Sequence, residues 1–473
     1  MVFNSFEFLW LFPVVFTVYY FFLFRTQWTQ RIPRLCNYVL IAISYGLYIK
    51  YNPVYALVLL WVTLVTYYFA LRIEKCLVKG NKRHLIWAGL ILSLLPLLLF
   101  KYYDFVSSQL EACLSFFGIC VGLPGLNWVM PLGISFFTLQ AVGYLADVYS
   151  QRIKAEHNWW DYMLFVCFFP QIVSGPISKA KDLLPQIKTQ RTFKYPQVLQ
   201  GMKWFLWGMF IKVVVADTLG LRIGVVLDNY QNNSGIMCLL CVFFYSFQIY
   251  CDFAGYSFMA VGVGEVLGFE LINNFRRPYF SQTVTEFWHR WHISLSAWLK
   301  DYIYIPLGGN RCSKARNYLN IFVTFMVSGI WHGASWTFIV WGALHGLFQI
   351  VEKILGINKL QSIELPLKWV RIIVTFVLVS FAWIFFRMPT LSDAWCVIVK
   401  IFTDGSGNVA GIVGPMSFIL IVLFKDFMDE YQIKALRLLH SRYAIIRWAT
   451  YLILFTAIAT TGVYGGQFIY SGF

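Results

Sequence analysis

The sequence predicts an all-α polytopic integral membrane protein, and three observations support that prediction. Of its 473 residues, 59% are hydrophobic and only 13% are charged, whereas soluble domains are about a quarter charged. Apolar runs of roughly 20 residues, the length that crosses a bilayer as a helix, recur along the chain. Short polar loops separate these runs, and no long linker divides them. We therefore expect one transmembrane domain over residues 1–473 and exclude a soluble, fibrous or disordered protein.

About 11 of the apolar runs are expected to be transmembrane helices. The candidates, in chain order, cover 6–24, 34–50, 53–72, 85–103, 130–149, 203–219, 235–253, 319–337, 339–353, 369–387, 411–426 and 446–464. Other apolar stretches are short or interrupted by proline, glycine and charge, which is typical of re-entrant or interfacial helices. These cover 105–122, 159–178, 257–270 and 285–305.

Positive charge is distributed in a way that predicts the orientation of the chain. Lysine and arginine outnumber aspartate and glutamate by 38 to 22, a formal net charge of +16. The excess lies in short loops between apolar runs, which is the pattern of the positive-inside rule and not of a surface for nucleic acid. The loops at 72–84 and 311–317 are expected in the cytoplasm and both termini outside it. No nucleic-acid partner is expected.

Several common catalytic motifs are missing from the sequence. It contains no G-x-S-x-G, no Walker loop, no G-x-G-x-x-G after a strand and no H-E-x-x-H, so serine hydrolase, ATPase, Rossmann and zincin functions have no support. Cys238 and Cys241 form a C-x-x-C, but they lie inside a predicted span without a second pair or a nearby histidine. No bound metal is expected there.

Polar residues inside apolar runs are informative because each costs free energy in lipid and tends to face a bundle interior or a wet cavity. The first such cluster contains Gln248 and Asp252, beside Gly255, which permits close approach of another backbone. The alternative is that Asp252 only marks the cytoplasmic end of a span.

The second cluster is FWHRWHISLSAWLKDYIYIPLGGNR, residues 287–311, which is too polar and too rich in tryptophan for a span. On a helix, His289 and His292 would be neighbours on one face, with Glu286 one turn earlier. We expect this segment to line an inward-facing cavity. The alternative is an interfacial helix with its tryptophans and histidines at headgroup level.

The third cluster is VSGIWHGASW, in which His332 falls within an apolar run and Gly329 and Gly333 leave room for a substrate. A histidine in a dry site stays neutral and can accept a proton, as acyl transfer to a hydroxyl requires. The alternative is a core histidine bonded to a backbone carbonyl. His345 would lie about 220° further around a continuous helix, so we expect it to point elsewhere and to be structural.

At these clusters the sequence resembles the membrane-bound O-acyltransferase (MBOAT) family. It is similar to the bacterial branch that includes the membrane subunit of alginate O-acetylation, its peptidoglycan counterpart and the protein for D-alanylation of teichoic acids. The resemblance rests on FW-x-RWH-x-SLS-x-W-x-x-DY-x-YIPLGGNR from Phe287, PLGISFFTLQ from Pro131, FFPQIVSGPI from Phe168 and WHG at Trp331. These core motifs lie within 131–346.

The resemblance implies a fold with a central funnel, and it implies site residues. The catalytic histidine of the family falls on His332 and its second invariant histidine on His292, whereas His289 occupies a variable position. The substrate-binding or funnel residues expected from these motifs and from the first cluster are Trp288, Arg290, Trp291, Asp301, Tyr304, Asn310, Trp331, Asp252 and Gln248. One departure is Phe258, where the branch commonly has aspartate.

The resemblance also implies a reaction and its partners. An acyl thioester, either acetyl-CoA or an acyl-carrier phosphopantetheine, would donate from the cytoplasm, and no cofactor would be bound. The acceptor would be a hydroxyl of an extracytoplasmic polysaccharide or of an extracytoplasmic acetyltransferase partner. An acyl-carrier protein on the cytoplasmic side is a second expected partner. The expected location is the bacterial cytoplasmic (inner) membrane.

Three other functions remain open at this point. One is D-alanyl transfer for teichoic acid. Another is a membrane metalloenzyme that uses Glu286, His289, His292 and His332 as ligands, although their order matches no zinc signature. The third is a non-catalytic polysaccharide translocator in which the aromatic residues form a sugar pathway. The sequence does not name the acceptor, because acceptor choice lies in outer loops.

Overall fold

The computed structural model describes residues 3–24, 34–172, 175–357, 365–405, 414, 416–433, 438–464 and 466. Over these residues the chain is helical and contains no strand, so the predicted all-α class is confirmed. The last predicted extracytoplasmic residues, 467–473, lie outside the described part. So does the start of the predicted span 411–426.

The described helices, in chain order, form an N-terminal, a middle and a C-terminal group. The N-terminal group is α1 (Phe6–Phe24), α3 (Leu35–Tyr51), α4 (Pro53–Lys75), α5 (Lys79–Phe116), α6 (Ile134–Tyr149), α7 (Trp159–Cys167), α8 (Phe169–Ile172) and α9 (Ala180–Lys188). The middle group is α10 (Tyr195–Met209), the π-helix η1 (Phe210–Ala216), α11 (Asp217–Leu227), η2 (Tyr230–Asn232), α12 (Gly235–Val266), η3 (Pro278–Phe280), α13 (Val284–Arg290), α14 (Ile293–Leu299) and the π-helix η4 (Lys300–Tyr304). The C-terminal group is α15 (Lys314–His332), α16 (Trp336–Ile354), α17 (Leu365–Arg387), α18 (Leu391–Thr403), α19 (Met416–Glu430), η7 (Leu438–His440) and α20 (Ala444–Thr461).

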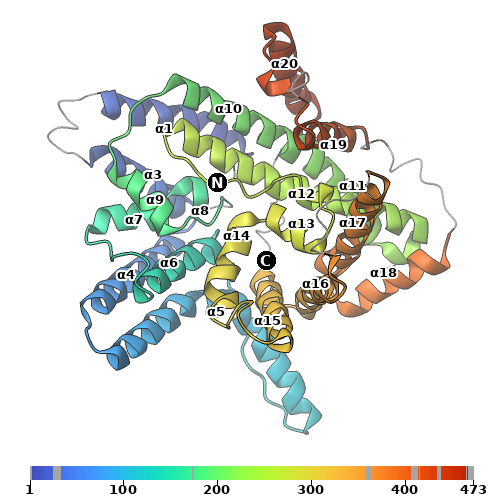
Figure 1. The fold of residues 1–473 in the computed structure, drawn as a ribbon, viewed down its shortest axis with the longest axis horizontal. Coiled ribbons are helices and arrows are strands. Elements are labelled where there is room, and N and C mark those ends of the chain that lie inside the picture. The colour runs from blue at the N-terminus through green and yellow to red at the C-terminus, as the bar shows by residue number, and fades with distance from the viewer. Residues whose placement is uncertain are drawn as a thin grey trace.

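Helices α12 to α16 lie in the middle of Figure 1, with α3 to α7 to one side and α17 and α18 to the other. Helix α20 and the far end of α5 extend away from this centre. Helices α13 and α14 carry the second cluster, and α15 carries most of the third. Both clusters therefore lie at the centre of the bundle. The fold thus gathers residues of 284–332 among helices from both ends of the chain.

The helices differ in length from the predicted spans. Within the described residues, six helices are long and apolar enough to cross a membrane: 6–24, 53–75, 79–116, 235–266, 366–387 and 444–461. Helix α5 joins the predicted span 85–103 to much of 105–122, and α12 joins 235–253 to much of 257–270. The number of about 11 spans stays a prediction.

Helix α12 packs against α10 so closely that the two backbones touch. A Cβ on Gly208 would lie 2.6 Å from the carbonyl oxygen of Gly255, and a Cβ on Gly201 would lie 2.5 Å from that of Gly262. Only glycine permits such an approach. The expected role of Gly255 in close backbone packing is therefore realised against α10.

Helix α5 contains Pro96, and a neighbouring helix supplies the hydrogen bond that this proline cannot donate. Pro96 has no N–H for the carbonyl of Leu92 four residues earlier, and that carbonyl instead accepts a hydrogen bond of 3.0 Å from Trp61 Nε1 on α4. Helix α5 therefore continues through the proline toward Lys101 and beyond.

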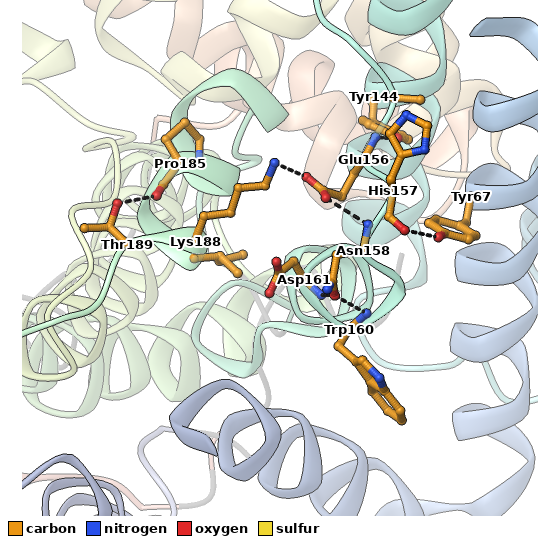
Figure 2. A network of polar contacts seen from close by, with 12 residues as sticks. Tyr67, Tyr144, Glu156, His157, Asn158, Trp160, Asp161, Pro185, Lys188 and Thr189 are labelled. Atoms are coloured by element: carbon orange, nitrogen blue, oxygen red, sulfur yellow. Dashed lines mark hydrogen bonds and ion pairs between the residues drawn. The ribbon is translucent and has the colours of Figure 1, made fainter. Parts of the chain in front are cut away.

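A polar network fixes the turn between α6 and α7 (Figure 2). The carboxylate of Glu156 pairs with Lys188 of α9 and accepts a hydrogen bond of 2.9 Å from the backbone N–H of Asn158. The Asn158 side chain accepts from the N–H groups of Trp160 and Asp161 and so caps α7. Backbone amides that a short helix leaves unpaired are satisfied in this way.

Candidate active site

His332 is the last residue of α15, and the chain turns back immediately after it into α16. Its side chain is 1% exposed. The imidazole ring lies 4.8 Å from the Trp341 ring of α16 and 5.3 Å from the Phe386 ring of α17. The surroundings of His332 are therefore buried and aromatic.

His292 lies at the break between α13 and α14 and has a left-handed backbone with φ of 43°. Asn274 stabilises this break, because its carbonyl accepts from the Ile293 N–H at 3.0 Å and its side chain from the Ser294 N–H at 3.1 Å. The His292 side chain is fully buried. In the part of the chain that the structure describes, neither of its ring nitrogens has a hydrogen-bond partner.

Trp331 joins the two histidines. Its ring centroid lies 4.9 Å from that of His332 and 5.9 Å from that of His292. Phe136 of α6 packs against both Trp331 and His292, and Phe253 of α12 lies 4.6 Å from His292. The structure therefore brings His332, His292 and Trp331 together; their catalytic roles stay predictions.

The expectation that His289 and His292 share one helix face is wrong. Helix α13 ends at Arg290, and the left-handed backbone of His292 turns the chain before α14 begins. His289 is exposed, whereas His292 is buried. The four proposed metal ligands do not converge, and among the described residues no group of three or more His, Cys, Asp or Glu could hold a metal ion.

The geometry assumed for His345 is also wrong, because α15 ends at His332 and His345 lies on the separate helix α16. His345 accepts a hydrogen bond of 3.2 Å from Trp288 Nε1 and packs 4.9 Å from Trp341. Gly333 does not leave room for a substrate either, because a Cβ there would lie 2.2 Å from the Phe338 ring. The glycine instead lets the hairpin of α15 and α16 close.

The other predicted residues of α13 and its end are built into the scaffold. Trp291 is fully buried and stacks on Phe287 at 5.4 Å. Arg290 makes paired hydrogen bonds of 3.0 Å to Glu430 and an ion pair of 2.6 Å with Glu286. Arg290 thus ties α13 to α19; its role toward a substrate stays a prediction.

Of the predicted residues in 301–310, one lines a cavity. A cavity of about 390 Å³ lies between α13, α14, α15 and α16, and its walls include Trp288, His289, Lys300, Tyr304 and Lys353. Asp301 forms an ion pair with Lys179 and is not among the lining residues. Asn310 is exposed on the turn after η4.

An aromatic wall lies between this cavity and His332. Trp288 lines the cavity, and its ring packs 5.6 Å from Trp341. Trp341 in turn packs 4.8 Å from His332. A group in the cavity is therefore separated from the imidazole by the Trp288 and Trp341 rings in this conformation.

Asp252 belongs to a buried ionic cluster that sequence reasoning missed. Lys212 of η1 lies 2.5 Å from Asp252 and 2.6 Å from Asp217, and the side chains of Lys212 and Asp252 are 0% and 2% exposed. The signal was the charged pair in the run FIKVVVAD. Asp252 is therefore paired with a buried lysine, on a helix that continues to Val266.

Gln248 and Phe258, which the sequence analysis also singled out, lie on the same helix α12. Gln248 lies one turn before Asp252, and its Nε2 would be 2.6 Å from a Cβ on Gly220 of α11. Phe258, where the resemblance leads us to expect an aspartate, stacks on Trp204 of α10 at 5.1 Å. An apolar contact between α12 and α10 thus occupies that position.

Lys101 is a second residue that sequence reasoning did not assign to the site. Its Nζ donates a hydrogen bond of 2.6 Å to the carbonyl oxygen of Trp331. The signal was a lysine within the apolar run LLPLLLFKYY, in the predicted span 85–103. Its partner lies 230 residues away along the chain, so no local pattern connects the two.

Fold and site together define a multi-pass helical membrane protein with two histidines buried in an aromatic centre. A family model described as MBOAT, the membrane-bound O-acyltransferase family, matches residues 45–388. The chain therefore belongs to the MBOAT family, and it is an acyltransferase of the membrane.

Three relatives are similar to this chain over more than half of its length. The chain is 37% identical to the probable alginate O-acetylase AlgI of Pseudomonas aeruginosa, over 89% of this chain and 81% of that protein. It is 34% identical to the peptidoglycan O-acetyltransferase of Helicobacter pylori, over 84% and 79% respectively. It is 29% identical to the teichoic acid D-alanyltransferase of Streptococcus thermophilus, over 56% and 69%.

Proposed function

We propose that this protein transfers an acetyl group from a cytoplasmic thioester to a hydroxyl outside the cytoplasm, with His332 as the base. The observation that carries the proposal is the buried pair of His332 and His292 against Trp331. The higher identity to two O-acetylating relatives than to the D-alanyltransferase favours acetyl over D-alanyl transfer.

The chemistry requires one base and one group that stabilises negative charge. His332 accepts the proton of the acceptor hydroxyl while its oxygen attacks the thioester carbonyl carbon. The tetrahedral intermediate then expels the thiolate, which takes the proton back from the imidazolium and leaves as a thiol. A ring N–H of His292 is suited to hydrogen-bond the carbonyl oxygen as it becomes negative.

The cavity of about 390 Å³ supports entry of the donor from the cytoplasm. Its walls include Lys300 and Lys353, whose positive charges suit a phosphorylated donor. It contacts α15 at Ile321, Thr324 and Phe325. Phe325 precedes His332 by seven residues, about 10 Å along a helix. The arm of a phosphopantetheine thioester would cover this distance once the Trp288 and Trp341 rings move.

The sidedness proposed here follows from charge. The basic residues of 311–317 lie directly before α15 and in its first turn, so the positive-inside rule favours the cytoplasmic side of a bacterial inner membrane for this end of α15. His332 ends a helix of 19 residues, which is roughly 28 Å long. The imidazole would then lie near the outer side, within reach of an extracytoplasmic polysaccharide or acetyltransferase partner. A cytoplasmic acyl-carrier protein would present the donor.

Oriented membrane vesicles test this proposal. Inside-out vesicles given labelled acetyl thioester from the outside should transfer label to a polysaccharide or partner protein enclosed in the lumen. Right-side-out vesicles treated in the same way should not, and His332→Ala vesicles of either orientation should be inactive. Equal labelling in both orientations of intact vesicles would contradict transfer across the membrane but not the His332 chemistry. Transfer by the His332→Ala protein at the wild-type rate would contradict that chemistry.

A further inference from the structure

The end of α15 that carries His332 is held by side chains of a different helix. A helix leaves the carbonyl groups of its last four residues without partners inside the helix. At the end of α15, the Ile330 carbonyl accepts a hydrogen bond of 2.8 Å from Tyr102 Oη, and the Trp331 carbonyl accepts one of 2.6 Å from Lys101 Nζ. Consecutive residues of α5 thus bind consecutive carbonyls directly before His332.

Lys101 is suited to this position by its charge as well as by its hydrogen bond. The carbonyl end of a helix carries partial negative charge, and a cation there is stabilising. The ammonium also lies 5.6 Å from the centroid of the Trp331 ring, within the range of a cation–π contact. A weaker contact of 3.4 Å reaches Ser135 Oγ at the start of α6. Lys101 therefore joins α5, α6 and α15.

Helix α5 also contacts the other side of the turn. Gln109 Oε1 accepts a hydrogen bond of 3.0 Å from Nε1 of Trp336, the first residue of α16. The turn after His332 is thus held from both sides by one helix. Asp104 fixes α5 in turn, because its carboxylate accepts from the backbone N–H groups of Leu126 and Asn127 at 2.7 and 3.0 Å.

We infer that Lys101 is a positioning residue for acyl transfer. It holds the Trp331 carbonyl, and through it the last turn of α15, so that the imidazole of His332 lies in the productive orientation. The inference rests on the proposed function of His332 as the base. It goes beyond that proposal because it assigns a role to a residue of α5, which contributes none of the family motifs identified in the sequence.

A positioning role and a merely structural role make different predictions. Misplacing a catalytic group by about 1 Å can cost about 10²-fold in rate, and this loss falls on kcat when the binding contacts of the donor are kept. Lys101 is not among the residues that line the donor cavity, so KM should change little. A purely structural lysine would lower the yield and thermal stability of the protein and leave kcat of the folded fraction intact.

The test compares variants of α5 in purified full-length protein with labelled acetyl thioester. Lys101→Met should lower kcat by about 10²-fold with KM within about threefold, and Lys101→Arg should restore at least a tenth of the wild-type kcat. Tyr102→Phe, which removes only the neighbouring hydrogen bond, should have a smaller effect in the same direction. Lys82→Met, near the start of the same helix, is the matched control and should behave as wild type.

His332→Ala, measured in parallel, separates the two proposals. If His332→Ala is inactive while folded Lys101→Met keeps the wild-type kcat, the positioning role is wrong and the proposed function stands. If His332→Ala keeps full activity, the proposed function itself is wrong. Should Lys101→Met fail to fold, Tyr102→Phe decides, because it removes the neighbouring hydrogen bond to the same turn of α15: a wild-type kcat in Tyr102→Phe would overturn the inference.

Discussion

The indole N–H of Trp288 donates a hydrogen bond of 3.2 Å to Nδ1 of His345. An imidazole that accepts at Nδ1 carries its proton on Nε2 when it is neutral. The bond joins α13 to α16, and the Glu352 carboxylate of α16 strengthens the same junction by accepting from the backbone N–H groups of Val284 and Thr285. His345 therefore contacts a residue of the cavity wall; the structural role expected from the sequence stays a prediction.

His345→Ala should act mainly on stability. The substitution removes a buried aromatic-sized side chain and leaves the Trp288 N–H without its acceptor, which together should cost about 2–5 kcal/mol of unfolding free energy. Thermal unfolding in detergent measures this, with His345→Gln as the control that can keep an acceptor. A fully stable His345→Ala protein that had lost turnover as completely as His332→Ala would contradict the structural role.

The three histidines of the central region should differ in effect. His332→Ala should lower turnover by about 10²–10⁴-fold, the range supplied by one general base, because the imidazole is the proposed base. His292→Ala should also be severe, since His292 is fully buried against Trp331. His289→Ala should keep most activity because His289 lies at the exposed wall of the cavity. Steady-state acetyl transfer by the purified variants measures these losses. A larger loss of activity in His289→Ala than in His292→Ala would contradict the prediction.

The ionic cluster in η1 and α12 should show strong coupling. Lys212→Met leaves Asp217 and Asp252 buried together without their cation. This should lower the free energy of unfolding by about 3–5 kcal/mol. Adding Asp252→Asn removes one of the uncompensated charges, so the double variant should be more stable than Lys212→Met alone. A double-variant cycle of thermal unfolding measures the coupling. Strictly additive losses would show that the cluster does not hold η1 against α12.

Native cysteines can test the orientation. Cys113 lies near the C-terminal end of α5, Cys120 lies in the segment after this helix, and Cys312 lies in the loop before α15; all three are exposed. Under the proposed orientation, an impermeant maleimide should label intact cells of a variant that retains only Cys113, and should not label a variant that retains only Cys312. Opening the membrane with detergent should make Cys312 reactive. The reverse pattern in intact cells would overturn the orientation.

Local sequence patterns predicted some parts of this molecule and not others. The all-α class and most apolar helices follow from composition and run length, and the buried site of His332 follows from its position in an apolar run. The breaks at 291–292 and 333–335 do not, because the first depends on the distant Asn274 and the second on Phe338 packed against Gly333. The partner of Lys101 is 230 residues away, so its role could not be recognised from its neighbours. Lys212 has a local partner in Asp217, but its pairing with Asp252 is long-range.

The wall formed by Trp288 and Trp341 would affect hydrolysis of the thioester as well as access of the donor to His332. A thioester is an activated ester, and a base able to activate a hydroxyl can equally activate water, which would waste the donor by hydrolysis. With the two indoles between the cavity and His332, a donor that entered without an acceptor would not meet the proposed base. The aromatic wall would thus protect the acyl group until both substrates are present, and the same feature that slows entry would preserve the yield of transfer.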